Sequence, residues 1–401
     1  MKKRKLKDMS DDELDKDILV RENLEVKRKL MRMTEEMEYL RKEMEKLKEE
    51  QRDCIVPTMN AKRVAECLPM DMCIELIDEA LSDFESKKCQ QPLRFGYRLP
   101  LKDKKFGILA SMPAFYNSGK RCYSPAAYKA VPYCSTKVIT VFPSNRKIGK
   151  HSHQGVIVLF EAETGEMKAI FDATEITAKR TAAASAVATL WLSSPDSTIL
   201  TLIGSGEQAK THLEAITIMR RIHQVNIWSR TRSNVDAFVK EARTKYPHLK
   251  FVISSSVREA CNGADIICTL TPSRVPLVTK DMVKPGAHIN AVGACTPDMH
   301  ELSSDLVTSA KIVADDREAC MKEPGDIVIP LREGVKIEIN STVGEIFNHL
   351  YGDEYSSPEE RSKANIGRCS DSEITIFESL GLALEDLACA VYLYEHSLNN
   401  S

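Results

Sequence analysis

The sequence predicts an α/β protein in which a doubly wound parallel sheet is joined to a mixed α+β domain and preceded by a coiled-coil helix. Three observations predict this arrangement. Residues 198–314 alternate apolar strand patterns with helical patterns, residues 54–193 mix strands with long helices, and the first fifty residues contain no glycine or proline. Repeated strand and helix patterns are typical of a parallel sheet that is covered by helices.

The predicted domains follow from these shifts in pattern. We expect a charged helix over 1–53, the doubly wound domain over 194–324, and the mixed domain over 54–193 together with 325–401. A chain of 401 residues is long enough for two domains, each with its own core.

The overall composition excludes several classes of protein. The net charge of −2 creates no strong field for nucleic acid or a membrane. The twelve cysteines contain no Cys-x-x-Cys pair, which predicts reduced thiols and a cytoplasmic location. No apolar run is long enough to cross a bilayer, and no apolar stretch follows the basic start as in a secretory signal. The basic residues 2–5 suit either a nuclear-import patch or a solvated charged start.

The N-terminal helix carries a heptad pattern. Its apolar seam, in alternating steps of four and three, consists of Val26, Leu30, Met33, Met37, Leu40, Met44 and Leu47, with Leu19 and Asn23 extending it upstream. A buried asparagine in such a seam favours two strands. In a parallel pair the acidic residues Glu22, Glu36 and Glu43 face the basic residues Lys27, Arg41 and Lys48, and Lys29 opposite Thr34 is the exception. The pattern predicts a parallel coiled coil rather than a solvated single helix.

Secondary structure is predicted along the two domains as follows. In the mixed domain we expect helices over 62–84, 175–192 and 380–394, strands over 137–142, 155–161 and 166–171, and a loop over 358–372. In the doubly wound domain we expect strands over 198–203, 225–228, 251–253, 265–269, 288–292 and 312–314.

A glycine turn ends the first of these parallel strands. The strand over 198–203 leads into Gly204, Ser205 and Gly206, and a helical pattern follows. Gly204 allows a tight turn, and Gly206 lets the backbone approach a ligand without a Cβ. A strand, a glycine turn and a helix N-terminus cradle a pyrophosphate in Rossmann domains. The sequence therefore predicts a dinucleotide site that includes Glu207, Gln208 and the small residue Ala209, which lets the helix pack closely.

The end of the next strand predicts which dinucleotide binds. Sites for NAD place an acid there, to hold the ribose 2′-hydroxyl. This chain has Ser229, Arg230 and Thr231 instead, with a further hydroxyl at Ser233. A guanidinium suits a 2′-phosphate, whereas an acid would repel it. We therefore predict NADP(H) in preference to NAD(H), against the alternative of an ordinary surface arginine.

Six motifs resemble a known family. They are MPAFY at 112, SHQ at 152, ITAKRTAAASA at 176, the IGSGEQA turn, VKPGAHINAVGA at 283 and TIFESLGLALEDLA at 375. In this order they resemble the ornithine cyclodeaminase/mu-crystallin family, and most closely its ketimine reductase members. The resemblance runs from about Leu68 to the C-terminus, so it leaves the heptad segment outside.

The resemblance implies a substrate site in the mixed domain. Composition alone cannot single out three cations among the 56 lysines and arginines. The resemblance implies that Arg94 and Arg180 bind the substrate carboxylate and that Lys137 contacts the carboxylate or the reacting nitrogen. It implies that Met112 and Pro113 shape the pocket wall, and that Ser379 and Gly381 close it.

The nicotinamide is expected beyond the strand ends of the parallel sheet. The residues assigned to that crevice are Thr269, Leu270, Thr271, His288, Asn290 and Val292. His151 and His153 invite a metal interpretation, but no acid or thiol neighbour completes a ligand set, so we expect no metal.

One departure from the family bears on the reaction. Cyclodeaminases carry an aspartate two residues after the Val-Gly pair, and this aspartate acts as a base. This chain has Cys295 at that position. A buried thiol is a poor substitute for a carboxylate. Loss of the base disfavours deamination of an amino acid, whereas an iminium needs only a hydride.

The predicted function is therefore NADPH-dependent reduction of a cyclic ketimine carboxylate to a cyclic imino acid. The substrate ring would be of piperideine, pyrroline or thiomorpholine type. The alternatives are an ornithine cyclodeaminase that uses NAD and an NADPH-dependent protein that binds thyroid hormone, since an iodothyronine carries the same carboxylate. The resemblance also implies a homodimer formed through the mixed domain.

Overall fold

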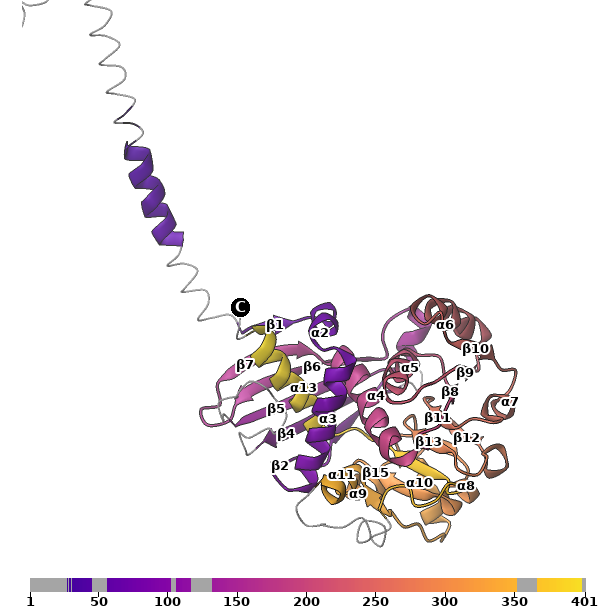
Figure 1. Cartoon of the computed structure of the whole chain (residues 1–401). Coiled ribbons are helices and arrows are strands. Elements are labelled where there is room, and N and C mark those ends of the chain that lie inside the picture. The colour runs from indigo at the N-terminus through magenta and orange to yellow at the C-terminus, as the bar shows by residue number, and fades with distance from the viewer. Residues whose placement is uncertain are drawn as a thin grey trace, which may run out of the picture. The chain divides into compact units, whose positions relative to one another are not determined.

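The structure, a computed structural model, describes residues 27, 29, 31–44, 56–101, 106–116, 132–351 and 366–398, in two compact units over 1–56 and 57–401 (Figure 1). In the first unit residues 31–44 form a helix. The seam residues Met33, Met37, Leu40 and Met44 are 54–69 % exposed. The helix is confirmed over these residues, the rest of the predicted seam lies outside the described residues, and its pairing into a coiled coil stays a prediction.

The second unit contains a seven-stranded sheet that is antiparallel except for one pair. Its strands are β1 (Thr58–Met59), β2 (Cys89–Gln90), β3 (Phe95–Pro100), β4 (Phe106–Tyr116), β5 (Tyr133–Val141), β6 (His153–Glu161) and β7 (Met167–Asp172). They lie in the order β1-β7-β6-β5-β4-β2, with β3 also paired to β4 and with β1 parallel to β7.

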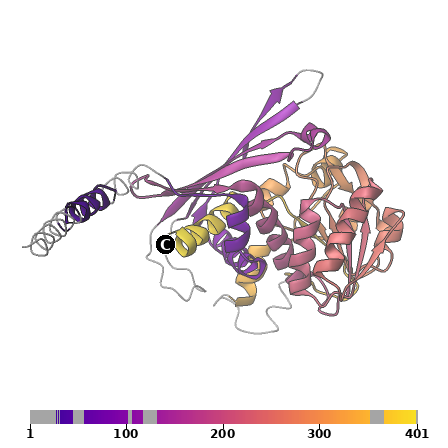
Figure 2. The same ribbon diagram turned by 90° about the horizontal axis from the view of Figure 1, so that it is seen from above.

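Helices cover one face of this sheet. They are α3 (Met70–Glu85), α4 (Ala173–Leu192) and α13 (Ala383–Leu393), which lie on the same side of the strands in Figure 2. The single helix predicted over 62–84 is wrong in one respect, because α2 (Ala61–Cys67) ends before Pro69 and α3 begins after it. A proline disfavours helical backbone at the residue before it, which separates the two helices.

The second sheet is parallel throughout, as predicted. Its strands are β8 (Ile199–Ile203), β9 (Gln224–Trp228), β10 (Lys250–Ile253), β11 (Ile266–Thr269), β13 (His288–Ala291), β15 (Lys311–Ala314), β16 (Ser341–Thr342) and β17 (Thr375–Glu378). Their order is β10-β9-β8-β11-β13-β17-β15-β16. The helices of this part are α5 (Glu207–Met219), α6 (Arg232–Lys245), α7 (Val257–Cys261), α8 (Ser304–Ser309), α9 (Arg317–Cys320), α10 (Gly325–Arg332) and α11 (Val343–Tyr351). A separate pair is formed by β12 (Arg274–Val278) and β14 (His300–Leu302).

The C-terminal segment corrects the predicted domain boundary at residue 324. β16 and β17 come from the segment assigned to the mixed domain, but they belong to the parallel sheet, and β17 inserts between β13 and β15. Apolar periodicity predicts a strand but not the sheet that it joins, because parallel partners can be far apart in sequence. The chain then crosses back, so that α13 packs on the antiparallel sheet.

Two further findings concern the described residues as a whole. No helix among them has both the length and the apolar character needed to cross a bilayer. The ten described cysteines carry free thiols, and the sulfurs of Cys73 on α3 and Cys389 on α13 lie 3.9 Å apart in the core.

Candidate active site

The predicted nucleotide edge lies where β8 and β11 end. These strands are neighbours, but the chain leaves β8 toward β9 on one side and returns to β11 on the other. Ligands of doubly wound sheets bind at such a switch point, beyond the carboxyl ends of the strands. Gly204 follows β8 with a φ of 126°, and a Cβ there would lie 2.9 Å from the backbone oxygen of Leu270. Glycine therefore lets the two loops meet.

The start of α5 fits a phosphate group. Gly206 is the N-cap of α5, and a Cβ built on it would meet no heavy atom within 4 Å. The first N–H groups of a helix have no partner within the helix, so open space before them suits phosphate oxygens. Ala209 is fully buried. The predicted residues 204–209 thus have the form of a phosphate cradle, and their contact with a cofactor stays a prediction.

Arg230 lies at the same edge of the sheet. Residues 229–231 follow β9, which is the neighbour of β8. Arg230 is exposed and makes no ion pair with the part of the chain that the structure describes, whereas Arg232 is paired to Asp236 at 3.0 Å. A guanidinium without a protein partner is available to an anion at this edge.

A buried carboxylate joins the loop after β11 to the loop after β13. Glu301, on β14, accepts hydrogen bonds from the amide and hydroxyl of Thr271, at 2.8 and 2.6 Å, and from the amide of Gly293 at 2.8 Å. Burial raises the pKa of Glu301 to about 7. The hydroxyl of Thr271 is therefore directed to Glu301, and Glu301, which the sequence analysis missed, shapes the wall. Val292 and Leu270 are half-buried at this edge, and Thr269 is fully buried.

Two residues predicted to face the crevice do not. His288 begins β13, at the end of the strand opposite the crevice, and it is fully buried between Thr375 and Asn290. Asn290 is also fully buried and donates to the hydroxyl of Thr189 on α4 at 3.0 Å. The prediction for both is wrong, because alternate residues of a strand point to opposite faces and these two point to α4.

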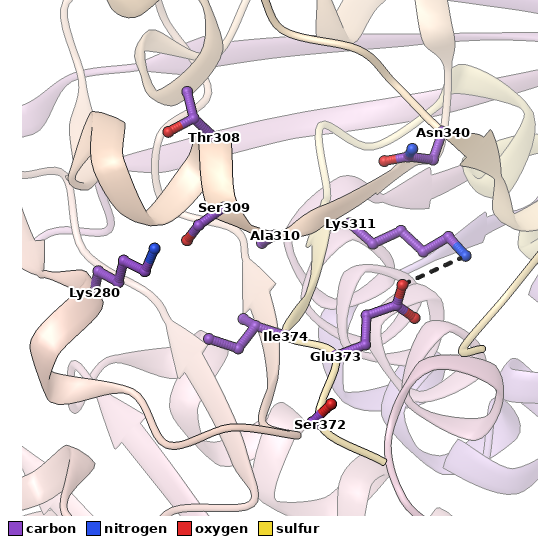
Figure 3. A pocket seen from close by; sticks show the side chains of 9 residues that line it. All are labelled: Lys280, Thr308, Ser309, Ala310, Lys311, Asn340, Ser372, Glu373 and Ile374. Atoms are coloured by element: carbon purple, nitrogen blue, oxygen red, sulfur yellow. Dashed lines mark ion pairs between the residues drawn. The ribbon is translucent and has the colours of Figure 1, made fainter. Parts of the chain in front are cut away.

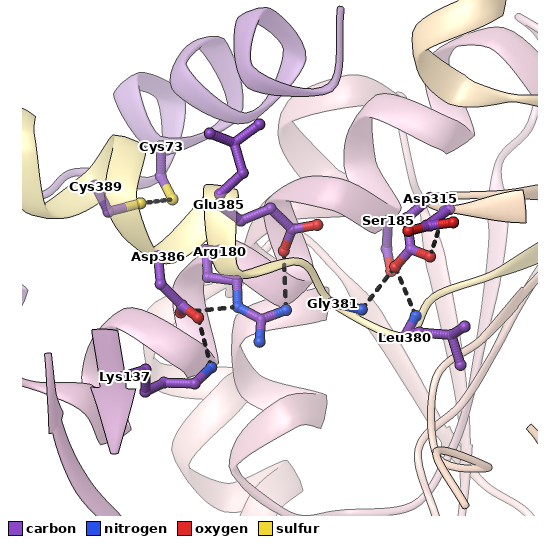
Figure 4. Close-up of polar contacts among 12 residues, drawn as sticks. Cys73, Lys137, Arg180, Ser185, Asp315, Leu380, Gly381, Glu385, Asp386 and Cys389 are labelled. Atoms are coloured by element: carbon purple, nitrogen blue, oxygen red, sulfur yellow. Dashed lines mark hydrogen bonds and ion pairs between the residues drawn. The ribbon is translucent and has the colours of Figure 1, made fainter. Parts of the chain in front are cut away.

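Lys137 lies on the helix-covered face of the antiparallel sheet. Its side chain is 2 % exposed, and its ammonium nitrogen lies 2.6 Å from Oδ2 of Asp386 on α13 (Figure 4). Met112 on β4 stands directly opposite Lys137, so the two side chains share a face. The predicted wall residue therefore neighbours the predicted lysine.

Arg180 reaches the same cluster from α4. It donates from Nη1 to Oε2 of Glu385 at 2.8 Å and from Nε to Oδ1 of Asp386 at 3.3 Å. Asp386 therefore bridges Lys137 and Arg180 with its two oxygens, and all four charged side chains are at most 5 % exposed. Buried charges are tolerated when they are paired in this way. The Nη2 of Arg180 has no hydrogen bond within the described residues.

Burial shifts the pKa values of two of these groups toward neutral pH. It lowers the pKa of Lys137 from 10.5 to about 8, Asp386 opposes this, and the charges of Arg180 and Arg94 lower it further. Burial raises the pKa of Glu385 to about 7, although Arg180 acts in the opposite direction. Groups that titrate near the working pH are suited to proton transfer.

Arg94 approaches the cluster from the segment before β3 and is the most open of the three cations. Its side chain is 27 % exposed, and its Nη2 donates to the backbone oxygens of Leu380 at 2.8 Å and Gly381 at 3.1 Å. The same nitrogen lies 3.0 Å from Oε2 of Glu323, which follows α9. Gly381, whose backbone oxygen accepts from Arg94, packs against the guanidinium of Arg180, and Arg180 shares Asp386 with Lys137, so the three predicted cations are gathered in one place.

The loop after β17 fits closely around these cations. Asp315 at the end of β15 accepts the amides of Leu380 and Gly381 at 2.7 and 2.6 Å. Gly381 has a φ of 80°, and a Cβ there would lie 2.1 Å from Nη1 of Arg180. Only glycine lets this loop pass over the guanidinium. Ser379 is buried, and its amide donates to Ala291 at 2.9 Å.

The acids of the cluster are the residues that the sequence analysis missed. Glu385 and Asp386 lie inside the quoted motif TIFESLGLALEDLA, directly after the SLG residues assigned to the pocket. Two adjacent acids in an otherwise apolar helix were the available signal, because buried carboxylates need cationic partners. Asp315 and Glu323 stand among exposed charges in the sequence and carry no such signal.

A second hollow lies at the opposite, amino edge of the parallel sheet. It is lined by Lys280, Thr308, Ser309, Ala310, Lys311, Asn340, Ser372, Glu373 and Ile374 and measures about 370 Å³ (Figure 3). Its buried Lys311 is already held by Cys369 at 3.1 Å and Glu373 at 3.8 Å. It contains none of the predicted site residues. Within the described residues no three His, Cys, Asp or Glu side chains are grouped as metal ligands.

The comparison with known families agrees with this architecture. The sequence profile of the ornithine cyclodeaminase/mu-crystallin family matches residues 56–401. The chain belongs to this family. The heptad helix lies before the matched region, so the second unit carries the family's fold.

Two similar proteins of the family are named as reductases. A Delta(1)-pyrroline-2-carboxylate reductase of Bacillus cereus is 32% identical over 343 residues, which is 85% of this chain and 96% of that protein. The ketimine reductase mu-crystallin of Mus musculus is 37% identical over 271 residues, 68% of this chain and 78% of that protein. The enzyme class that these names give agrees with the reductase predicted from the sequence.

Two solved structures share the fold. The Thermococcus litoralis Delta(1)-pyrroline-2-carboxylate reductase, in complex with NADH and L-proline, has a TM-score of 0.76 at 31% identity and covers 86% of this chain and 98% of its own. An archaeal alanine dehydrogenase dimer with bound NAD has a TM-score of 0.72 at 29% identity, over 86% of this chain and 97% of its own. The α/β fold with a Rossmann-like domain is thereby confirmed.

Proposed function

We propose that this protein reduces a cyclic ketimine carboxylate to the saturated cyclic imino acid, with NADPH as the reductant. The observation that carries the proposal is the gathering of Arg94, Lys137 and Arg180 beside a Rossmann-like sheet. Relatives that share this architecture are named as reductases of pyrroline-2-carboxylate and of ketimines. The expected substrates have piperideine, pyrroline or thiomorpholine rings.

Arg94 is the residue best placed to receive the substrate carboxylate. It is 27 % exposed, whereas Lys137 and Arg180 are 2 % and 5 % exposed and already share Asp386. All three polar contacts of Arg94 use Nη2, which leaves Nη1 and Nε without a hydrogen bond within the described residues. Two N–H groups of a guanidinium can bind a carboxylate in parallel.

Lys137 would donate the proton that the reduction requires. Reduced nicotinamide, when bound, supplies a hydride for the imine carbon. A ketimine that binds as the neutral imine, and not as the iminium, must gain a proton at its ring nitrogen as the double bond to carbon is lost. The Lys137 ammonium gives this proton and becomes a neutral amine. The Asp386 carboxylate at 2.6 Å keeps the ammonium charged and aimed before transfer.

The preference for NADPH rests on the segment after β9. Arg230 at this edge makes no ion pair within the described residues, and no acid occupies positions 229–231. A 2′-phosphate would find charge-assisted donors there. The residues expected to hold the rest of the cofactor are those of the cradle, 204–209, and the half-buried edge residues Leu270 and Val292.

The proposed reaction is tested with the purified full-length chain. Piperideine-2-carboxylate and pyrroline-2-carboxylate are supplied with NADPH or NADH, and consumption of the reduced nicotinamide is followed by its near-ultraviolet absorbance. The expected result is turnover with a higher kcat/KM for NADPH. No turnover of any cyclic ketimine would refute the proposal. Titration with an iodothyronine, with and without NADPH, tests the predicted hormone binding, because Arg94 would meet that carboxylate as well.

Cys295 distinguishes this reaction from ornithine cyclodeamination. Burial raises the pKa of the Cys295 thiol, although the charge of Arg94 acts in the opposite direction, so Cys295 is a neutral group. We expect no ammonia release from ornithine. Cys295→Asp should raise the KM for the ketimine about tenfold, because a second carboxylate would compete for Arg94. Cys295→Ser, the matched control, should stay within about twofold. Ammonia release by the unmodified protein as fast as ketimine reduction would contradict this prediction.

We also propose a homodimer formed through the uncovered face of the antiparallel sheet. Phe95, Ser111, Val138 and Val156 stand side by side across β3, β4, β5 and β6, on the face opposite Lys137. Phe95 is 67 % exposed, and Val138 and Val156 are 38 % and 40 % exposed. Exposed apolar side chains on three of four neighbouring strands, with Ser111 between Phe95 and Val138, mark an interaction surface.

Sedimentation tests the predicted dimer. Replacing Phe95 and Tyr97 together by lysine should weaken dimerisation at least about a hundredfold, because charges would be buried against the partner. Ile148→Lys is the control, since Ile148 is 69 % exposed but lies outside the sheet. Deleting residues 1–53 should leave catalysis and this dimer intact and remove only the added association of the predicted coiled coil. A monomeric unmodified protein would contradict the proposal.

A further inference from the structure

Each cation of the site already has a carboxylate of this chain beside it. Lys137 and Arg180 are balanced by Asp386 and Glu385, and these four groups are nearly or completely buried. The remaining cation, Arg94, has Glu323 at 3.0 Å from its Nη2. The site therefore carries little net charge before an anionic ligand arrives, and a substrate carboxylate must compete with carboxylates of the protein itself.

Glu323 is the least secured of these carboxylates. Its Oε2 is buried, and Arg94 is the one cation in contact with it within the described residues, so the charge of Arg94 is its main compensation. Burial raises the pKa of Glu323, and Arg94 acts in the opposite direction. Asp386, by contrast, has contacts to two cations. Glu323 is therefore the carboxylate of this chain that an incoming anion meets at Arg94.

Glu323 contacts the guanidinium of Arg94 at one nitrogen and leaves the other two nitrogens open to a second carboxylate. Arg94 comes from the segment before β3 of the antiparallel sheet, whereas Glu323 lies between α9 and α10 of the parallel-sheet part. The Nη1 and Nε of Arg94 have no hydrogen bond within the described residues, so a carboxylate could bind there while Glu323 remains at Nη2. Two carboxylates on one guanidinium repel each other, which weakens the binding of the second.

We propose that Glu323 sets the affinity of the site for the substrate carboxylate, because it already pairs with Arg94 and repels a second anion there. This inference deepens the proposed function and rests on it for the identity of the substrate. Glu323 is a specificity-determining residue that acts through Arg94 and takes no part in hydride or proton transfer. Its removal therefore strengthens binding of the substrate, the opposite of what loss of a binding or purely structural residue does.

The test compares Glu323→Gln with the unmodified full-length protein in the presence of NADPH. We expect the KM for the cyclic ketimine carboxylate to fall about five- to tenfold, with kcat within about twofold. Glu318→Gln is the matched control, because Glu318 is exposed and pairs with Lys322. If Glu323→Gln folds poorly, Glu323→Ala removes the same charge and should give the same shift.

Calorimetry separates this inference from the proposed reaction. Pyrrole-2-carboxylate, a planar carboxylate with a five-membered ring, should bind Glu323→Gln about five- to tenfold more tightly than the unmodified protein. The uncharged pyrrole-2-carboxamide should bind both alike. If the carboxylate binds in this way but no ketimine is turned over, the proposed reaction fails and the role of Glu323 stands. An unchanged or weaker affinity in Glu323→Gln, or no binding of the carboxylate to either protein, would overturn the inference.

Discussion

Replacing Lys137 by methionine should lower the kcat of ketimine reduction about a thousandfold, within the range that a positioned proton donor contributes. Methionine keeps most of the volume of the lysine chain but has no proton to give. The KM should change less, because Arg94 is the open cation and remains in place. Steady-state kinetics with NADPH measure both quantities.

The pH profile provides an independent check on Lys137. Its pKa of about 8 means that the donating ammonium is present below this pH and is lost above it. The kcat of the unmodified protein should therefore fall as the pH rises through about 8. In Lys137→Met this limb should be absent, because no group at this position titrates.

Two further variants show whether a loss of activity comes from misfolding. Lys137→Arg keeps a cation beside Asp386 but holds its proton too tightly to donate it, so its kcat should fall as in Lys137→Met. Lys168→Met is the control, since Lys168 lies on β7 and pairs with Glu166 outside the site. More than a tenth of the original kcat in both Lys137 variants would show that the proton comes from another group.

Arg230→Ala should raise the KM for NADPH about 10- to 100-fold and leave the KM for NADH within about twofold. A hydrogen bond to a charged group contributes about 1.5–3 kcal/mol, and 1.36 kcal/mol corresponds to a factor of ten. Only NADPH carries the 2′-phosphate that Arg230 would bind. The measurement is kcat/KM for both cofactors at a saturating ketimine concentration.

Arg232→Ala is the matched control for this cofactor test. Arg232 stands two residues further on and is similarly exposed, but it is already paired to Asp236. We expect its loss to change the preference between the cofactors by less than about threefold. If Arg230→Ala lowered kcat/KM equally for NADPH and NADH, the assignment of the 2′-phosphate site would be wrong.

Local sequence patterns were sufficient for most of the nucleotide-binding part. The strand before Gly204, the glycine turn and the helix after it are determined by neighbours in sequence, so residues 199–219 form the predicted unit. Arg230 could be placed for the same reason, because the segment after a second strand lies at the same edge of a parallel sheet. The family resemblance directed attention to Arg94, Lys137 and Arg180, which composition could not distinguish from other cations.

These local patterns could not predict contacts between residues that are far apart in sequence. Asp386 meets Lys137 across 249 positions of the chain only because α13 crosses back onto β5. β17 joins the parallel sheet through partners far away in sequence, which moved the domain boundary. His288 and Asn290 were misplaced because a short buried strand is apolar on both sides, so its pattern does not reveal which face meets the crevice.

The sequence by itself determined the α/β class, the glycine cradle and the cationic segment after β9, and the family resemblance added that Cys295 stands where cyclodeaminases have an aspartate that acts as a base. These features depend on residue type at short spacing, where backbone geometry is set locally. Only the tertiary structure decided that the three cations share one cluster and that carboxylates of the chain already accompany them. Electrostatic balance depends on distances and burial in space, and these arise when α13 and the loop after β17 close over β5 and α4.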